Sequence, residues 1–247
     1  MEAYEYEVMA AVEAEHWWYR GMRALSAAWL DQHYRPQSGL RILDAGCGTG
    51  GNGAFLRRYG SVAAIDISAL ALQLGRRRLA GGLSRASVAE LPFRSAAFDL
   101  VTSFDVLYHR AVIDERVALR ETLRVLRPGG RLLIRLPAYK WLRSDHDRSV
   151  HGRHRYTAAE TRDLLTSAGF AVERLSYINS LLLPIPVLQR LIERVAPRPA
   201  AHESQLELPV PPLNTALGTV FSAEALWLRQ GRRFPAGLSV LALACKP

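Results

Sequence analysis

The chain has 247 residues with an ordinary apolar fraction of 49%, which suits one well-buried α/β domain with an elaboration and excludes two full-sized domains. Its net charge of +9 raises the question of nucleic-acid binding, but Lys140 and Lys246 are the only lysines and the arginines are mostly dispersed, so a nucleic-acid partner is not expected. There is no signal-peptide pattern and no apolar run long enough to span a bilayer, so we expect a cytoplasmic protein whose Cys47 and Cys245 are free thiols.

The predicted elements begin with helix and then alternate between strand and helix. Residues 1–39 carry an approximate helical stripe of apolar side chains. The following strands are expected at residues 40–44, 61–65, 86–88, 98–104 and 131–136. Helices are expected between them at residues 54–59, 69–79 and 114–126. This alternation predicts a parallel sheet with right-handed crossovers and helices on both faces.

The remainder of the chain predicts a helix, a strand, a proline-rich segment and a last strand. Thr157 and Glu160 form a capping-box pattern at the start of a helix that Gly169 ends. Strands at 171–177 and 238–244 complete a Rossmann-like, seven-stranded, mostly parallel sheet. We therefore expect a single domain made of a helical lid (1–39), a cofactor-binding core (40–180), an inserted cap (181–235) and a last strand (236–247).

A glycine-rich turn follows the first strand, where backbone amides can approach a ligand at the carboxyl edge of a parallel sheet. Gly46, Gly48 and Gly51 also satisfy the dinucleotide pattern G-x-G-x-x-G, so the glycines alone leave a nicotinamide-dependent oxidoreductase open. Asp44 ends the strand before this loop, where a carboxylate can meet the ammonium of a bound amino-acid moiety, which a dinucleotide lacks. Asp66 ends the second strand, where a carboxylate accepts hydrogen bonds from ribose hydroxyls.

Five segments in order between about residues 40 and 137 resemble class I S-adenosyl-L-methionine-dependent methyltransferases. They are Leu43-Asp44-Ala45-Gly46-Cys47-Gly48-Thr49-Gly50, Asp66, Glu90-Leu91-Pro92-Phe93, Phe98-Asp99-Leu100-Val101 and Arg127-Pro128-Gly129-Gly130. This resemblance implies cofactor contacts along the loop, at the ribose and at the adenine, from Asp44, Gly46, Gly48, Gly50, Asp66, Ile67, Ser87, Val88 and Phe104. Many relatives carry Asp where Ser87 stands, so the hydrogen bond to the adenine amino group is expected to be weaker here.

Four further segments resemble, more narrowly, a bacterial methyltransferase subgroup whose substrates are mostly unassigned. They are His16-Trp17-Trp18-Tyr19-Arg20, Leu136-Pro137-Ala138-Tyr139, Ser144-Asp145-His146-Asp147 and Tyr177-Ile178-Asn179-Ser180. This resemblance extends over most of the chain and does not identify the acceptor.

The candidate acceptor-side residues come from loops that follow predicted strands. His109 and His146 are the candidate catalytic residues, because histidine is the side chain whose unperturbed titration lies near neutrality. Trp18, Tyr108 and Tyr139 are candidate substrate contacts, and Tyr19 and Arg23 are candidate cofactor contacts from the lid, although packing and ordinary surface roles explain these residue types equally well.

A metal site is not expected in the loop after the fifth strand. Asp145, His146, Asp147, His151 and His154 have a spacing that could suit a metal, but the neighbouring arginines offer those carboxylates ion-pair partners.

The sequence therefore predicts methyl transfer from S-adenosyl-L-methionine to a small-molecule acceptor, with a natural-product intermediate as one candidate. The alternatives are a nonmethylating relative or cofactor-binding scaffold, and a nicotinamide-dependent oxidoreductase, for which no catalytic Tyr-x-x-x-Lys pair is evident. A membrane-surface role for residues 181–195 is a further alternative, limited by Pro184 and Pro186. The sequence indicates neither the nucleophile nor the oligomeric state.

Overall fold

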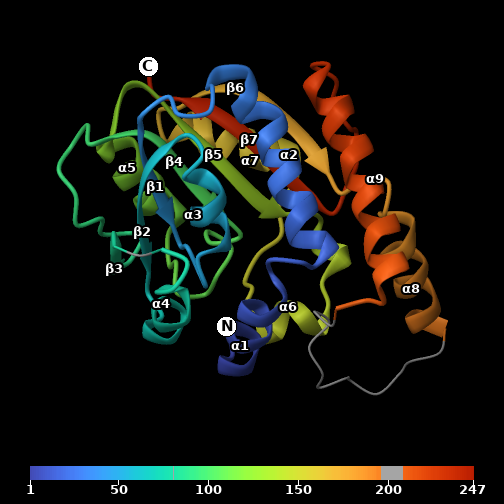
Figure 1. The fold of residues 1–247 in the computed structure, drawn as a ribbon. Helices are drawn as coiled ribbons and strands as arrows, with labels where there is room; N and C mark the ends of the chain where they lie inside the picture. The colour runs from blue at the N-terminus through green and yellow to red at the C-terminus, as the bar shows by residue number, and fades with distance from the viewer. Residues whose placement is uncertain (80, 196–207) are drawn as a thin grey trace.

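The computed structural model describes residues 1–79, 81–195 and 208–247, and its centre is one seven-stranded sheet (Figure 1). The strands are β1 Leu40–Ala45, β2 Gly60–Asp66, β3 Leu83–Arg85, β4 Phe98–Phe104, β5 Leu126–Pro137, β6 Ala171–Ile178 and β7 Ser239–Cys245. Their order is β3-β2-β1-β4-β5-β7-β6, and β7 is antiparallel to both of its neighbours while the other pairs are parallel. The predicted Rossmann-like, mostly parallel sheet is confirmed.

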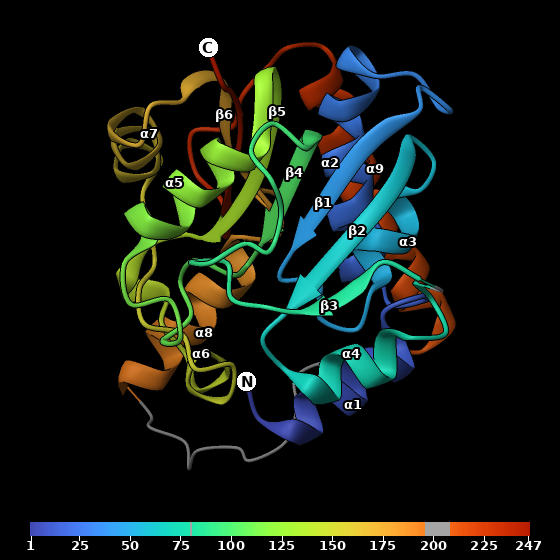
Figure 2. The same cartoon turned by 90° about the vertical axis from the view of Figure 1, so that its left-hand side faces the viewer.

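Helices cover both faces of this sheet (Figure 2). They are α1 Ala3–Val12, α2 Trp17–His33, α3 Gly51–Leu56, α4 Ala69–Gly75, α5 Glu115–Val125, α6 Asp145–Ser149, α7 Ala158–Ser167, α8 Pro184–Val195 and α9 Pro211–Arg229, with the 3-10 turn η1 at Lys140–Leu142. Helices α5 and α7 lie on one face, and α2, α3 and α9 lie on the other. Within the described parts of the chain, no helix combines the length and the hydropathy that crossing a bilayer requires.

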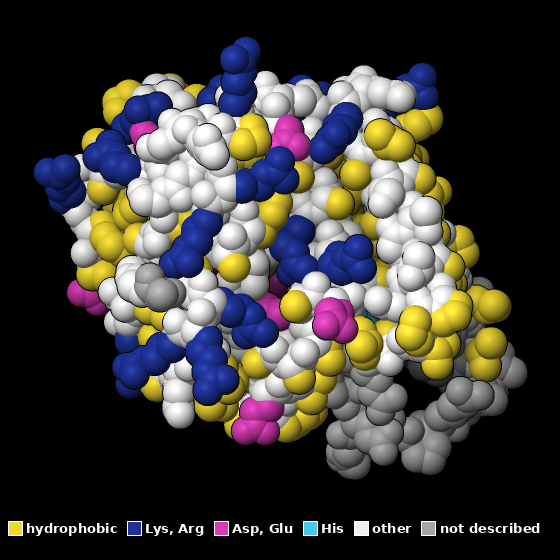
Figure 3. Space-filling view, viewed as in Figure 1, with side chains coloured by type: hydrophobic (Ala, Val, Ile, Leu, Met, Phe, Trp, Pro, Cys, Tyr) yellow, Lys and Arg dark blue, Asp and Glu magenta, His cyan; other side chains and the backbone are white. Residues whose placement is uncertain are grey.

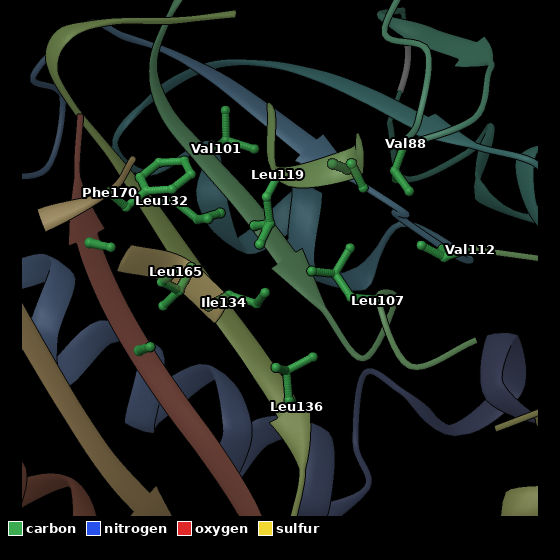
Figure 4. Close-up of a cluster of buried hydrophobic side chains, with 14 of the residues drawn as sticks. Val88, Val101, Leu107, Val112, Leu119, Leu132, Ile134, Leu136, Leu165 and Phe170 are labelled. Atoms are coloured by element: carbon green, nitrogen blue, oxygen red, sulfur yellow. The ribbon is translucent and has the colours of Figure 1, made fainter. Parts of the chain in front are cut away.

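The strand period of two divides the buried side chains between two cores. In β5, Leu132 and Ile134 pack with Leu119 of α5 and Leu165 of α7, as Figure 4 shows, whereas Leu133 between them faces the opposite layer. That opposite core also contains Met22, Leu25 and Trp29 of α2 and Phe221 and Leu228 of α9. A strand buried on both faces therefore reads as the continuous apolar run seen in the sequence.

Some element boundaries differ from the sequence prediction because local hydrogen bonds end the elements elsewhere. The third strand lies at Leu83–Arg85 instead of 86–88, since the amide of Ala86 donates the last bond to Asp66 and the chain then turns at Ser87. Thr157 and Glu160 form the predicted capping box at the start of α7. Such boundaries depend on cap geometry, which periodicity does not resolve.

The segment predicted as a cap over the pocket, residues 181–235, is divided between two environments. Residues 196–207 of this segment lie outside the described residues. Helix α9 packs along α2, with Phe221 so close to Gly21 that a Cβ atom at position 21 would overlap its ring. Helix α9 is therefore part of the core, and within the described part of this segment α8 alone borders the cavity described next.

Candidate active site

A cavity of about 620 Å³ opens at the edge of the sheet where the parallel strands end. Strands β2, β4, β5 and β7 contribute residues to its wall, as do the turns that follow β1, β3 and β6 and the helices α1, α2, α6 and α8. Of the residues predicted for the site, the structure brings together Trp18, Tyr19, Gly46, Gly48, Asp66, Ile67, Ser87, Val88, Phe104, Tyr108, His109 and His146. A cavity of this size at the carboxyl edge of an open α/β sheet is where ligands of this architecture bind.

Four predicted site residues do not line this cavity. Asp44 is buried beneath the glycine loop, and Gly50 begins α3, facing Leu79. Arg23 donates to the backbone carbonyl of Glu13 at 2.9 Å, so its guanidinium holds the lid segment. Tyr139 stacks on Tyr177 with ring centroids 5.0 Å apart, outside the cavity wall.

The glycine loop presents its backbone to the cavity because its residues adopt left-handed conformations. Gly46 has φ +87°, and a Cβ atom there would overlap Val106, whereas Gly48 has φ +53° and faces the cavity. The Asp66 carboxylate accepts hydrogen bonds from the amides of Gly48 (2.9 Å) and Ser68 (2.8 Å). Asp66 therefore joins the end of β2 to the loop after β1, and burial raises its pKa.

Asp44 lies wholly inside the protein, where its carboxyl group has one hydrogen bond. The hydroxyl of Thr102 donates to Oδ1 at 2.9 Å, and Oδ2 has no partner among the described residues. Burial raises the pKa of Asp44 to about 7. A ligand in the cavity can therefore reach this carboxyl group only through the loop backbone or through water.

We expect Asp44→Asn to change how stability depends on pH. Because the folded-state pKa of about 7 lies above the ordinary aspartate pKa of 3.8, the native state retains a proton that the unfolded chain releases. This group's contribution to stability is therefore lost as pH rises between those values. The wild type should lose up to about 1.4 kcal/mol of unfolding free energy per pH unit from this group, and Asn should remove that slope. Urea unfolding from pH 4 to pH 7 measures the unfolding free energy at each pH, and Asp163→Asn, which changes an exposed carboxylate, is the control. If the free energies of wild type and Asp44→Asn change with pH in parallel, the raised pKa of Asp44 is refuted.

Glu13, which the sequence prediction missed, joins the segment between α1 and α2 to the glycine loop. Its buried carboxylate accepts from the hydroxyl of Thr49 at 2.6 Å and pairs with Arg78 Nη1 at 3.1 Å. A Cβ atom on Gly51 would overlap this carboxylate, so the glycine at position 51 is what admits Glu13. The contact joins residues that are far apart in sequence, so no local sequence pattern predicts it.

The two candidate catalytic histidines line the same cavity in different electrostatic settings. Burial lowers the pKa of His109 to about 4, its Nδ1 accepts from the amide of Ala111 at 3.0 Å, and its Nε2 lies 3.0 Å from the amino nitrogen of Met1. His146 lies on α6, and its buried Nδ1 has no partner among the described residues. Of the two, only His146 has a buried ring nitrogen with no partner within the described chain.

The sequence prediction also missed an ion pair on the cavity wall, between Arg135 and Asp105. Arg135 is almost fully buried, and its Nε and Nη2 donate to one oxygen of Asp105 at 2.8 and 2.6 Å. The rings of Trp18 and Phe104 both lie 5.1 Å from its guanidinium carbon. An arginine inside the apolar run of residues 131–136 is the signal that could have identified this site residue.

Asn179 is a third cavity residue that was not singled out, although it lies in one of the segments that resemble the bacterial subgroup. Its backbone has φ +54°, and its buried Oδ1 has no partner among the described residues. The carboxylate of Glu224 accepts from the amides of Ser180 (2.7 Å) and Leu181 (2.8 Å), which fixes the turn that carries Asn179. The turn that carries Asn179 is thus held in place, and Oδ1 retains an acceptor capacity that no described residue uses.

Known proteins resemble part of this chain in sequence. Residues 43–134 match a family described as a methyltransferase domain. A demethylmenaquinone methyltransferase of Clavibacter sepedonicus is 46% identical over 105 residues, covering 40% of this chain and 42% of its own. An O-methyltransferase of Penicillium expansum is 34% identical over 168 residues, covering 60% of this chain and 58% of its own. The chain thus spans about half the length of the curated relatives that it matches.

Solved structures share the fold over nearly the whole chain. A methyltransferase from Thermotoga maritima superposes with a TM-score of 0.59 at 18% identity, covering 98% of this chain and 95% of its own. A geranyl diphosphate C-methyltransferase from Streptomyces coelicolor, solved with S-adenosyl-L-homocysteine, has a TM-score of 0.57 at 16% identity, covering 90% of this chain and 79% of its own.

The fold is the Rossmann-like fold of class I methyltransferases. Residues 43–134 resemble the methyltransferase domain family, and one of the solved structures with this fold holds S-adenosyl-L-homocysteine, the product of the cofactor S-adenosyl-L-methionine. The residues present fit this cofactor, since the side-chain-free backbone of Gly48 and the carboxylate of Asp66 meet on the cavity wall.

Proposed function

We propose that this protein transfers a methyl group from S-adenosyl-L-methionine to a small-molecule acceptor held in the cavity between the glycine loop and His146. The observation that carries the proposal is the shared cavity, because Gly48 and Asp66 on one side and His146 and Asn179 on the other line one space. The names of the relatives support a small-molecule acceptor, since one acts on demethylmenaquinone and one on geranyl diphosphate. A natural-product intermediate remains one candidate.

The chain's own residues supply binding, alignment and a proton acceptor. The cofactor, when bound, supplies an electrophilic methyl group on a sulfonium centre. The backbone of Gly48 and the carboxylate of Asp66 would hold the donor, and Trp18 and Tyr19, which line the same cavity, would exclude water from it. We assign to Nδ1 of His146 the proton that a hydroxyl or ammonium acceptor loses, because this nitrogen lacks another partner among the described residues. Asn179 Oδ1 orients the acceptor by accepting a hydrogen bond from it.

Methyl transfer is tested by following the donor. The purified protein is incubated with S-adenosyl-L-methionine and a panel of phenols, amines and carboxylic acids, and S-adenosyl-L-homocysteine and methylated products are measured by mass spectrometry. Acceptor-dependent release of S-adenosyl-L-homocysteine supports the proposal.

A second candidate function is a reaction that leaves the donor intact. The [4+2]-cyclase SpnF has the same fold, with a TM-score of 0.53 at 22% identity over 85% of this chain and 76% of its own. Conversion of an added substrate while S-adenosyl-L-methionine remains unconsumed would favour this function over methyl transfer.

Asp66→Ala should weaken the binding of S-adenosyl-L-homocysteine roughly tenfold or more. In our proposal the carboxylate accepts hydrogen bonds from the ribose hydroxyls, and it also accepts one from the amide of Gly48. Titration calorimetry measures the dissociation constant, and Asp163→Ala, an exposed carboxylate on α7, serves as the matched control. Equal affinities for wild type and Asp66→Ala would remove Asp66 from the ribose site.

A further inference from the structure

One side of α8 exposes large apolar side chains beside the cavity. Leu181, in the turn before the helix, and Ile185, Leu188 and Ile192 within it are exposed by 52%, 53%, 58% and 49%. Their spacing of four, three and four residues places them on one side of a helix, and we call them the α8 stripe. Clustered exposure of this kind marks a binding surface more often than it occurs by chance.

The α8 stripe is continuous with the cavity. Pro186, Gln189 and Ile192 of α8 line the cavity wall, so Ile192 belongs to both surfaces. At 100° per residue, the cavity-lining positions and the stripe occupy adjoining sides of the helix. Leu142 of η1, the turn that packs against α8, also lines the cavity. An apolar path therefore leads from the cavity wall onto the outer surface, where Figure 3 shows hydrophobic side chains along the margin formed by α8 and α9.

The two ends of this path differ in polarity. On the cavity wall, His146 and Asn179 each carry a buried polar atom, Nδ1 and Oδ1, without a partner among the described residues. Outside, the four stripe residues carry no polar group. A ligand that matches both ends has a hydrogen-bonding head and an apolar chain.

Building on the proposed function, we propose that the methyl acceptor is an amphiphile whose polar head enters the cavity and whose alkyl or prenyl chain lies along the α8 stripe. Ile192 belongs both to the cavity wall and to the α8 stripe. This shared residue favours an alkyl or prenyl chain of the ligand bound in the cavity over a separate protein partner or a membrane. From Ile185 to Ile192 the helix rises by about 10 Å, which gives room for several methylene groups beyond the cavity.

The test uses protein saturated with S-adenosyl-L-homocysteine and para-alkylphenols with ethyl, butyl, hexyl and octyl chains. Calorimetry should show affinity rising roughly two- to fourfold for each added methylene, as expected for partial to full burial of each group. The double variant Ile185→Ser/Leu188→Ser should lower the affinity for the octyl compound about tenfold and leave that for the ethyl compound and for S-adenosyl-L-homocysteine unchanged. Leu226→Ser, which alters a leucine of α9 that is 60% exposed, is the matched control and should change neither.

Affinity that is independent of chain length, no binding at any length, or equal losses in the double variant and the control would overturn the amphiphile proposal. If the double variant loses self-association in light scattering, the stripe binds a second copy of the chain. If it loses cosedimentation with phosphatidylglycerol vesicles, the stripe binds a membrane. Either result would also overturn the amphiphile proposal. Failure of S-adenosyl-L-homocysteine to bind in the first titration is a separate result, which refutes the proposed function itself.

Discussion

His146→Ala lowers the rate of the methyl-transfer step by roughly 10²–10⁴-fold while the affinity for S-adenosyl-L-homocysteine stays within about twofold of wild type. The reason is geometric, since Nδ1 of His146 faces no other partner in the described chain and shares the cavity with the donor-binding residues. Single-turnover rates with the acceptor found by the release screen measure this step directly. Calorimetry on the same preparation separates it from donor binding.

His109→Ala serves as the matched comparison, because it removes the other histidine of the cavity. Burial holds the pKa of His109 at about 4, so at neutral pH it is uncharged and accepts a proton poorly, and both of its ring nitrogens have neighbours. We expect a loss of less than about tenfold from this change. Wild-type rates in both variants would exclude a histidine base and leave proximity and alignment as the source of catalysis.

Gly48→Val should reduce the affinity for S-adenosyl-L-homocysteine by about two orders of magnitude or more, which corresponds to at least about 2.7 kcal/mol. A valine side chain would project from a backbone that lines the cavity, in a conformation at φ +53° that branched residues rarely adopt. The nearest atom to the new Cβ is the flexible end of Met9 at 3.1 Å, so the fold itself can adjust. Calorimetry with circular dichroism on the same sample separates lost binding from lost structure.

The control for this experiment is Gly39→Val. Gly39 also has a positive φ, of +68°, but no atom lies within 4 Å of its added Cβ, and it lies away from the cavity. Both variants should lose a similar stability of about 1–2 kcal/mol, because both force a left-handed conformation on valine. If Gly48→Val is folded and binds S-adenosyl-L-homocysteine as tightly as Gly39→Val does, the loop does not hold the cofactor.

The order of elements and the places of Gly46, Gly48 and Asp66 on the cavity wall were predictable from the sequence because their signals are local. Apolar runs such as residues 240–244 mark strands buried on both faces, and a strand followed by Gly46 and Gly48 marks a loop at the carboxyl edge. Asp66 is predictable for the same reason, since the end of the second parallel strand necessarily lies beside the end of the first. These inferences need only the periods of helix and strand and the direction of a crossover.

The remaining features were decided by contacts between distant parts of the chain. The sequence does not show that α9 packs on α2 instead of covering the cavity, because an apolar helix face does not specify its partner. Likewise, Glu13 meets Thr49 and Arg135 meets Asp105 only after the lid and the sheet have assembled. His109 and His146 look equivalent as residues after strands, and burial and neighbouring groups alone distinguish them. Tertiary structure determined these features because hydrogen-bond partners and burial depend on which elements pack together, and local sequence does not encode that choice.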